Sequence, residues 1–532
     1  MPEASAGDEG HDPSVTLDGT SLSPGDVVAV ARDDAPVTVP EVAREDVRAA
    51  RERVADVLDG DEAVYGLTTG FGDLVDTRIP REDVDALQLN LLRSHAAGVG
   101  RELTREEVRA LLCTRVNALV KGYSGVREVV VDHLVAMLNE GVHPVVPSRG
   151  SLGASGDLAP LAHAALVLVG EGEADTPEGR LPGDEALATA GLEPLDLRAK
   201  EGLALINGTQ LTVGLAALLV HDAEQLCRAA DAAGALTTEV TMGSTAASDP
   251  AIQDLRPHAG QAESARVVKA CCADSEIVES HRNCDRVQDA YAIRCLPQVH
   301  GAVRDAVAHL RDAVAVELNS ATDNPLIFPA GAVDRRTSGT DAADVVSGGN
   351  FHGAPLAHRL DYVTAALTDL AAIAERRVDR MLNPHVQEDH IPPFLTPEGG
   401  LESGLMLAQY TAAAMVNECR SEGRPAVDNT PVSGNQEDHV SMSATSALAA
   451  RRTLERARRV TAVELLCAAQ AAEYVDDDLA HGNGTGAAYA AVREVVPPLE
   501  DDRPPKPDIE AVESLVASGA LDQAMTAALP AW

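Results

Sequence analysis

The sequence predicts a mainly α-helical protein, in which long helices form a bundle and a smaller N-terminal domain precedes them. Of its 532 residues, 45% are hydrophobic but only 2% are aromatic, so the core is built from Ala, Leu and Val. Such a composition favours helices packed on helices. Several alanine- and leucine-rich stretches also exceed the average globular helix of about 11–12 residues. Long apolar helices of this kind predict a bundle whose faces are shared between subunits.

The N-terminal region combines turn residues with short β-branched runs. Residues 1–40 contain SVTL, DVVAVA and APVTV, which predict irregular structure with a pair of strands. The following segment, EVAREDVRAARERVADVLDG, has apolar residues three and four apart and ends in glycine, which predicts a helix. VYGLTTGFGDL is rich in glycine and is expected to be a loop. Further helices are expected at 81–95, 104–120 and 125–140.

The rest of the chain alternates between long helical stretches and polar interruptions. Helices are expected at 202–235, 299–321, 354–384, 402–420 and 441–476. Loops are expected at 171–200, 329–350, 385–401 and 421–436, where glycine, proline and charge accumulate. A solvated linker at 495–509 precedes a short terminal helix. We therefore predict three domains: 1–205 with the Ala-Ser-Gly loop, 206–490 with the long helices, and 491–532 with the linker and terminal helix.

The charge is strongly acidic, with 83 Asp and Glu against 43 Lys and Arg and a formal net charge of -40. This balance excludes nucleic acid as a partner and disfavours an anionic membrane surface, because both require a basic face. It suits a halophilic protein, since concentrated salt screens self-repulsion. The longest apolar runs, such as LTVGLAALLV, are shorter than the roughly 18 residues of a membrane span. The N-terminus is acidic, unlike a signal peptide. We expect a cytoplasmic protein.

The cysteines and histidines do not form a metal-binding pattern. None of the eight cysteines is in a C-x-x-C pair, so neither a zinc site nor a disulfide framework is indicated. The tetrapeptide QEDH occurs twice, at 387–390 and 436–439, but without the H-E-x-x-H spacing of a zinc enzyme. We expect no metal.

One short motif carries unusual chemistry: Ala154-Ser155-Gly156, within GSLGASGDLAPLAH at 150–163. If the chain bends sharply, the Gly156 nitrogen can attack the Ala154 carbonyl, and glycine makes that bend accessible. The Ser155 hydroxyl can then leave as water and create an exocyclic alkene. The product is a methylidene-imidazolone, an electrophile made from the protein itself. The tripeptide alone is a weak signal, because it also occurs in ordinary flexible turns.

The longer string resembles the signature of the aromatic amino acid ammonia-lyases, which form 4-methylidene-imidazole-5-one (MIO) from Ala-Ser-Gly. Other blocks follow in the family's order: VTLDG, YGLTTGFG, LLRSHAAGVG, LINGTQ, VQDAYAIRC, TDNPLIF, SGGNFHG and NQEDHVSM. The resemblance covers residues 15 to about 480. It implies a carbon-nitrogen lyase that needs no external cofactor. It also implies a homotetramer whose active sites combine residues of more than one subunit.

The resemblance assigns roles to the residues that act on the amino acid. Tyr65 matches the general base that removes the β-proton, a task that requires a depressed phenol pKa. Arg294 matches the clamp for the substrate carboxylate, which its planar guanidinium can bind through two hydrogen bonds. Tyr291 is three residues earlier and would share a helix face with Arg294. Gln288 is expected one turn further back on that face, as a polar contact.

Further matches concern the electrophile and the pocket wall. Asn207, in INGTQ, matches an asparagine that polarises the electrophile together with Tyr291. Asn324, in TDNPLIF, matches one that helps to hold the carboxylate. Phe351, in SGGNFHG, matches an aromatic side chain lining the pocket. Outside the family context, NG and NP are ordinary turn sequences.

Two positions bear on which amino acid is accepted. Ser94-His95 resembles the pair found in histidine-specific members, where His95 would contact the substrate imidazole. Glu437 matches an acid near that imidazole, and a carboxylate can accept its N–H and stabilise positive charge on it. The resemblance therefore implies deamination of L-histidine to trans-urocanate and ammonia, the first step of histidine degradation.

Three alternatives remain open. A phenylalanine or tyrosine ammonia-lyase or an aminomutase of the same family would use the same motif, although Ser94-His95 and Glu437 argue against it. A lyase of the fumarase–aspartase group would carry a GSxxMPxKxN loop, which is absent. A catalytically inactive scaffold would be expected to lose Ser155, Tyr65 or Arg294, and all three are present.

Overall fold

The computed structural model describes residues 14–60, 64–69, 78–282, 284, 286–427, 429–530 and 532. They form two compact units, each assembled from three separated stretches of chain. Unit 1 comprises residues 1–218, 311–360 and 424–448, and unit 2 comprises residues 219–310, 361–423 and 449–532. The division into three consecutive domains expected from the sequence stays a prediction.

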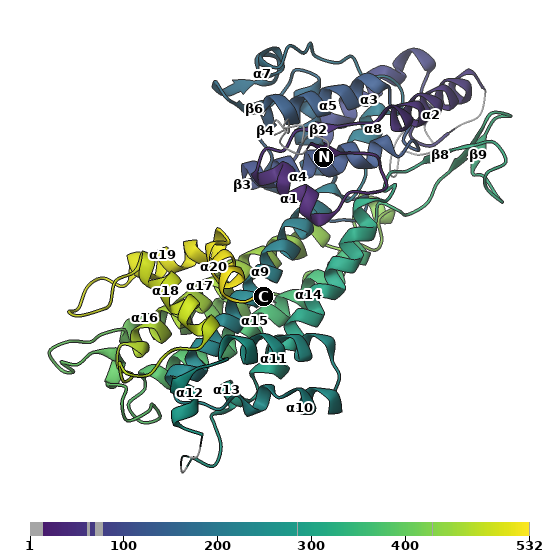
Figure 1. Cartoon of the computed structure of the whole chain (residues 1–532). Helices are drawn as coiled ribbons and strands as arrows, with labels where there is room; N and C mark the ends of the chain where they lie inside the picture. The colour runs from purple at the N-terminus through teal and green to yellow at the C-terminus, as the bar shows by residue number, and fades with distance from the viewer. Residues whose placement is uncertain are drawn as a thin grey trace, which may run out of the picture. The chain divides into compact units, whose positions relative to one another are not determined.

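Helices dominate both units (Figure 1). Those of unit 1 are α1 Pro24–Arg32, α2 Glu41–Asp59, α3 Val84–His95, α4 Arg105–Val120, α5 Glu128–Glu140, α6 Leu158–Leu168, α7 Gly183–Thr189 and α8 Glu201–Ile206. Those of unit 2 are α10 Pro250–Leu255, α11 Ala259–Cys271, α12 Glu276–Ser280, α13 Tyr291–Arg294, α16 Met406–Ser421, α18 Asn483–Val495, α19 Lys506–Ala517 and α20 Ala520–Ala528. The mainly helical fold expected from the composition is confirmed.

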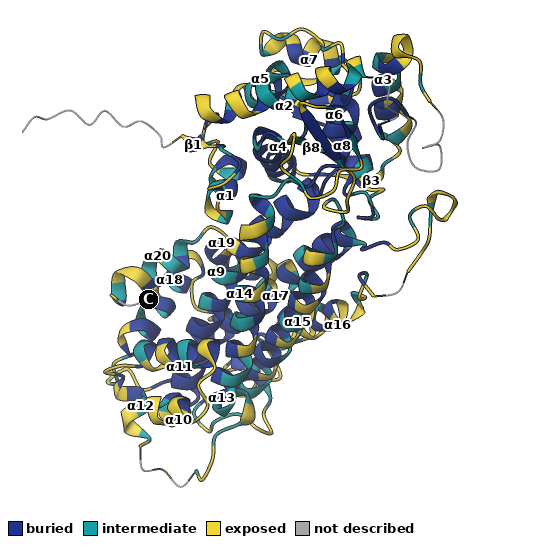
Figure 2. Cartoon of the chain, turned by 90° about the vertical axis from the view of Figure 1, so that its right-hand side faces the viewer, coloured by how far each residue is buried: buried dark blue, intermediate teal, exposed yellow. Residues whose placement is uncertain are grey.

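Four helices of 23 to 31 residues carry the chain past the boundaries of the units. They are α9 Gln210–Val240, α14 Leu296–Leu318, α15 Ala354–Leu382 and α17 Ser443–Ala472. In unit 2 they lie side by side (Figure 1), and Figure 2 shows dark blue, buried residues along them. Buried polar contacts join these helices. His300 on α14 contacts Asp231 on α9 at 2.7 Å, and Arg377 on α15 pairs with Glu464 on α17 at 2.5 Å. The long-helix bundle is therefore confirmed. None of the described helices combines the length and hydropathy that a membrane span requires.

The strands are short and lie in unit 1. They are β1 Val15–Thr16, β2 Val37–Thr38, β3 Val99–Glu102, β4 His143–Pro144, β5 Pro147–Arg149, β6 Glu173–Thr176, β7 Gly179–Pro182, β8 Leu326–Pro329, β9 Ser338–Gly339 and β10 Ala343–Val346. The first two pair in parallel, with Val15 opposite Val37, as expected from SVTL and APVTV. The others form the antiparallel sheets β3-β5, β4-β6-β7 and β8-β10-β9.

Three expectations from the sequence were wrong. DVVAVA is part of helix α1 and not a strand, because Ser23 and Asp26 form a capping box and Pro24 opens the helix. The intervals 171–200 and 329–350 are not simple loops, since the first holds β6, β7 and α7 and the second holds β9 and β10. The chain ends in α19 and α20, where one short helix was expected.

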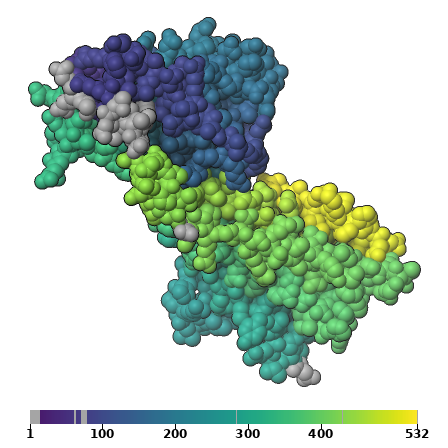
Figure 3. Space-filling view, turned by 180° about the vertical axis from the view of Figure 1, so that it is seen from behind, coloured from purple at the N-terminus to yellow at the C-terminus, as the bar shows by residue number. Residues whose placement is uncertain are grey.

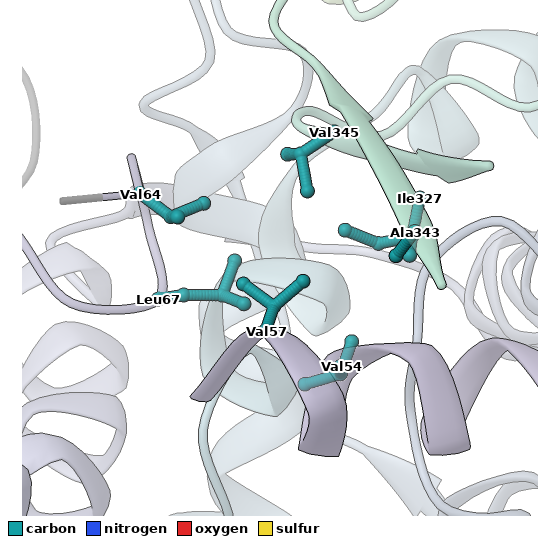
Figure 4. Packing of buried hydrophobic residues seen from close by; sticks show 7 residues of the cluster. All are labelled: Val54, Val57, Val64, Leu67, Ile327, Ala343 and Val345. Carbon is teal, nitrogen blue, oxygen red and sulfur yellow. The ribbon is translucent and has the colours of Figure 1, made fainter. Parts of the chain in front are cut away.

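A cluster of aliphatic side chains ties the turn containing Tyr65 to the rest of unit 1 (Figure 4). Its members are Val54, Val57, Val64, Leu67, Ile327, Ala343 and Val345, all buried. Figure 3 shows the green surface of the 311–360 segment adjoining the purple surface of the N-terminal residues, and helix α2 packs against β8. Two stretches far apart in the chain thus form one core, and all of its described members are aliphatic.

Candidate active site

The 154–156 loop connects strand β5 with helix α6 and is pressed against a second turn. Gly156 has a φ of +75°, and a Cβ on it would overlap the Gly208 carbonyl. The two glycines form an isolated parallel bridge, and the Asp157 N–H donates to the Gly208 carbonyl at 2.7 Å. Only glycine fits this backbone approach without displacement. The chain therefore turns at Gly156 in the left-handed region, and ring closure between Gly156 and Ala154 stays a prediction.

Asn207 occupies a break between two helices. Helix α8 ends at Ile206 and α9 begins at Gln210, so the single helix expected over 202–235 is interrupted. The Asn207 side-chain Nδ2 donates to the Ser155 carbonyl at 2.8 Å. Its Oδ1 is buried and has no hydrogen-bond partner among the described residues. Gly208 has a φ of +141°, and a Cβ at this position would overlap the Gln210 side chain. The turn therefore requires glycine, which has no Cβ.

Glu437 lies beside the loop serine. The Ser155 hydroxyl donates to Glu437 Oε1 at 2.6 Å. His95, the last residue of α3, donates from Nδ1 to the Leu91 carbonyl at 2.9 Å. Burial lowers the pKa of His95, and the Leu91 carbonyl and the nearby Glu437 carboxylate oppose that shift. The structure therefore brings Ser155, Asn207, Glu437 and His95 together, and burial favours the neutral form of the His95 imidazole.

The segment after His95 is fixed to the helix that follows the loop. The Gly98 N–H donates to His163 Nε2 on α6 at 3.0 Å. Val99 then pairs with Arg149 in the β3-β5 ladder, directly before the glycine-rich approach to Ala154. The segment after His95 and the loop thus share one local framework.

Two further segments close around Gly153 and its neighbour Leu152. The Gly153 carbonyl accepts hydrogen bonds from the Gly353 N–H at 3.0 Å and the Ser441 hydroxyl at 2.9 Å. The Met442 N–H donates to the Leu152 carbonyl at 2.7 Å. Phe351, two residues before Gly353, is half-buried in this neighbourhood.

Asp157 is a site residue that the sequence reasoning missed. Its carboxylate is fully buried and accepts hydrogen bonds from the Ser151 hydroxyl at 2.7 Å and the Thr212 N–H at 2.8 Å. Burial raises its pKa, and these hydrogen bonds oppose that effect. Its place directly after the tripeptide, at the start of a helix, was the available signal.

Asn324 belongs to a segment that contacts the Asn207 turn. Its Oδ1 accepts from the Gly348 N–H at 2.8 Å, and its Nδ2 donates to the Ser347 hydroxyl at 3.2 Å. Two residues earlier, the Thr322 hydroxyl accepts from Gln210 Nε2 at 2.8 Å. The two predicted asparagines are therefore connected through one side-chain contact.

Tyr65 is half-buried in the turn at 64–69, where the Val64 N–H donates to the Thr68 hydroxyl at 2.8 Å. The following residues, 70–77, lie outside the described part of the chain. The proposed base is thus placed in unit 1, with the loop.

The other predicted residues belong to unit 2. The Arg294 guanidinium stacks on the Tyr291 ring at 4.6 Å, so these two share a helix face as expected. Tyr291 is 75% exposed, whereas Arg294 Nε is buried without a hydrogen-bond partner among the described residues. Gln288 is not on that face, because α13 begins at Tyr291 and the preceding Ala290 has a non-helical backbone, with a ψ of 148°.

The first QEDH copy, at 387–390, has a structural role in unit 2. Glu388 forms ion pairs with Arg286 and Arg380, so it holds together segments of unit 2. Its counterpart Glu437 faces Ser155 instead. Among the residues that the structure describes, no cluster of three metal-ligating side chains occurs.

The model of the aromatic amino acid lyase family matches residues 22–494. The chain belongs to the aromatic amino acid lyase family. A probable histidine ammonia-lyase of Halobacterium salinarum is 63% identical over 97% of this chain and 98% of its own length. The match covers the Ala-Ser-Gly loop and both units.

Solved structures of this lyase family show the same fold. Histidine ammonia-lyase from Trypanosoma cruzi has a TM-score of 0.88, with 38% identity over 97% of this chain and 96% of that one. Tyrosine aminomutase from Streptomyces globisporus has a TM-score of 0.90, with 38% identity over 97% of this chain and 99% of that one. Because both structures superpose on this chain with similar TM-scores, the fold alone does not distinguish a lyase from an aminomutase.

Proposed function

We propose that the protein is a histidine ammonia-lyase, which eliminates ammonia from L-histidine and releases trans-urocanate. The observation that carries this proposal is the Glu437 carboxylate 2.6 Å from the Ser155 hydroxyl, close enough to His95 to influence its pKa. A carboxylate and a neutral imidazole beside the loop can both bind an imidazole substrate. The 63% identity to a probable histidine ammonia-lyase supports the same substrate.

The surroundings of the 154–156 loop fit an MIO group. Gly156 is bent and packed against Gly208, and Asn207 donates to the Ser155 carbonyl. That oxygen would become the ring carbonyl, so Asn207 would hold the ring and withdraw electrons from it. The unpartnered Asn207 Oδ1 leaves an acceptor for a donor brought by the substrate. The group supplies an electrophilic alkene for the substrate's amino group, and no external cofactor is needed.

The other side chains of unit 1 bind the substrate and remove its β-proton. Glu437 and His95 bind the imidazole ring, and Glu437 stabilises the positive charge that the ring carries as the β-proton becomes acidic. Tyr65 removes that proton, while Phe351 lines the pocket. Asn324 donates to the substrate carboxylate from a segment fixed by Ser347 and Gly348.

Arg294, Tyr291 and Gln288 complete the site from another copy of the chain. We infer a homotetramer in which these unit 2 residues approach the loop of a neighbouring subunit. Two observations support this arrangement: Tyr291 is 75% exposed, so its hydroxyl can reach a neighbouring loop, and the buried Arg294 Nε has no hydrogen-bond partner among the described residues. Tyr291 also borders an open pocket of about 560 Å³ with apolar side chains such as Val299 and Ile373.

The excess of acidic residues supports work in a salt-rich cytoplasm, so the assay belongs in concentrated salt. Purified protein is incubated separately with histidine, phenylalanine and tyrosine, and the ultraviolet absorbance of the conjugated acid is followed. We expect urocanate from histidine alone. Cinnamate from phenylalanine, or a β-amino acid from tyrosine, would replace this proposal by the alternative within the family.

The electrophile is tested independently of the substrate. Cyclisation and dehydration remove two waters, so the intact mass must be lower than the sequence mass by that amount. Ser155→Ala abolishes the second loss and, on this proposal, the turnover of histidine. Full activity of Ser155→Ala would overturn the mechanism.

A further inference from the structure

Behind the Asn207 turn lies a buried arginine that the proposed mechanism does not use. Arg115 is on α4, is 2% exposed, and belongs to unit 1. Its Nη1 donates to the Asn207 carbonyl at 2.9 Å and to Gln210 Oε1 at 2.6 Å. A single guanidinium nitrogen therefore bridges both ends of the turn between α8 and α9.

The Arg115 guanidinium lies in the space that a side chain at position 208 would need. A Cβ at Gly208 would lie 2.9 Å from Arg115 Nη1 and 2.7 Å from the Thr322 hydroxyl. Gln210 continues the chain of contacts, because its Nε2 donates to that hydroxyl at 2.8 Å. Arg115 thus fixes a turn that touches the loop on one side and the Asn324 segment on the other.

The charge of Arg115 is incompletely compensated. Its Nε and Nη2 are buried and have no hydrogen-bond partner among the described residues. Burial lowers the pKa of Arg115 to about 10, and the negative charge of Asp323 opposes that shift. Asp323 itself forms a close ion pair with Lys200 and not with Arg115. The guanidinium remains positive at neutral pH. Such a buried charge is normally paired, so its retention here calls for a role.

We propose that Arg115 is a positioning residue for closure of the 154–156 loop. It holds the turn as a wall, against which Gly156 packs and from which Asn207 reaches the Ser155 carbonyl. The inference rests on the proposed function, because it concerns the formation of the MIO group. It assigns Arg115 no contact with the substrate.

The reaction that this wall favours balances without any co-reactant. The Gly156 nitrogen bonds to the Ala154 carbonyl carbon, and the Ala154 oxygen leaves as water with the amide protons of Gly156 and Ser155. The Ser155 hydroxyl then leaves as a second water with the Ser155 Cα proton. No group is oxidised or reduced. The first bond requires the nitrogen and the carbonyl to be pressed together, and a fixed opposing surface supplies that geometry.

Helix α4 offers a matched control in Arg109. It is also 2% exposed and donates to the Val30 and Leu138 carbonyls at 2.7 and 2.9 Å. None of these contacts involves the loop or the Asn207 turn. Replacing either arginine by methionine removes a buried guanidinium of the same helix, so the pair separates a general loss of stability from a specific effect on closure.

The experiment compares wild type, Arg115→Met, Arg115→Lys and Arg109→Met as full-length protein in concentrated salt. Intact mass gives the fraction that has lost two waters at fixed times after synthesis, and urea unfolding gives stability. In Arg115→Met we expect closure to slow on the order of 100-fold, the scale of a small misplacement of reacting groups. Arg115→Lys should recover part of the rate, because an ammonium can donate to one of the two acceptors. Arg109→Met should lose stability but close at the wild-type rate.

The closure rates of the variants decide whether Arg115 positions the loop. Wild-type closure in Arg115→Met, or equal slowing in Arg109→Met, would overturn the role of Arg115. If Arg115→Met does not fold, Arg115→Lys and Gln210→Met decide, since each weakens the clamp while retaining the buried charge. Wild-type rates in both would overturn the proposal. An unmodified mass in the wild type would instead refute the proposed function itself.

Discussion

The Glu437 carboxylate accepts a 2.6 Å hydrogen bond from the Ser155 hydroxyl, although 282 residues separate the two in the chain. Glu437→Gln tests what the charge contributes. Glutamine keeps an acceptor for Ser155, so the loss of two waters should persist. The positive charge on the substrate ring would no longer be stabilised, and kcat for histidine should fall about 100-fold or more. Intact mass and urocanate absorbance measure the two effects separately.

The repeated tetrapeptide provides the control for that variant. Glu388→Gln makes the same change in the first QEDH copy, where the carboxylate pairs with Arg286 and Arg380. Glu388→Gln should lower the free energy of unfolding, because the ion pairs with Arg286 and Arg380 are lost. It should change kcat for histidine much less than Glu437→Gln does. An unchanged kcat in Glu437→Gln would contradict the role of Glu437.

Gly156→Ala tests the close approach of the loop to Gly208. The new Cβ would overlap the Gly208 carbonyl, and φ is +75°. We expect the intact mass to show no loss of water and histidine turnover to drop about 100-fold or more. Gly179→Ala is the control, because Gly179 has a φ of +116° but open space around it. That variant should lose only about 1–2 kcal/mol of unfolding free energy and close normally; closure in Gly156→Ala would show that the contact is dispensable.

Lys200 and Asp323 form a buried ion pair at 2.6 Å, with side chains 0% and 2% exposed. Lys200→Met leaves the Asp323 carboxylate buried without its cation, so the free energy of unfolding should fall by about 3–5 kcal/mol. Adding Asp323→Leu removes the stranded charge and should restore part of the loss. Urea denaturation of the two single variants and the double variant, at constant salt, completes the cycle. Strictly additive losses would mean that the two groups do not interact.

His143 makes stability depend on pH. Its burial beside Arg109, which donates to its Nε2 at 3.0 Å, lowers the pKa to about 4. The unfolded imidazole titrates near 6.5. Between these values only the unfolded chain binds the proton, so the free energy of unfolding falls as pH is lowered through the window.

His143→Gln should reduce the slope of the unfolding free energy against pH by the contribution of about one proton. The reason is that the glutamine amide oxygen can accept a hydrogen bond from Arg109 at every pH. Urea midpoints for wild type and variant from neutral pH to about 4.5 measure it. Parallel pH profiles would show that His143 does not contribute.

The helices were largely predictable because alanine and leucine dominate them and glycine or proline ends them. α15, for example, begins at Ala354 as expected and ends two residues before the predicted boundary. DVVAVA was assigned wrongly because its β-branched residues outweighed the Ser23–Asp26 capping box. Local propensity is a weak guide when a cap and a buried face favour the helix.

The site was predictable only in part. Motifs named Ser155, Asn207 and Glu437, but spacing could not show that their side chains meet. The break at Asn207 was hidden because apolar residues continue on both sides of it. Asp157 and Arg115 were missed because their importance lies in long-range contacts within a buried interior, which leave no periodic signal in the sequence.

The closing contacts on Gly153 have a consequence for the life of the protein before it is complete. The Ser441 hydroxyl that binds the Gly153 carbonyl lies 288 residues further along the chain, and the Met442 N–H binds Leu152. While the ribosome is still adding those residues, the loop lacks this support. On the proposed function, we therefore expect the electrophile to form fully only after the 441–442 segment has been made and has joined the Asn207 turn around the loop.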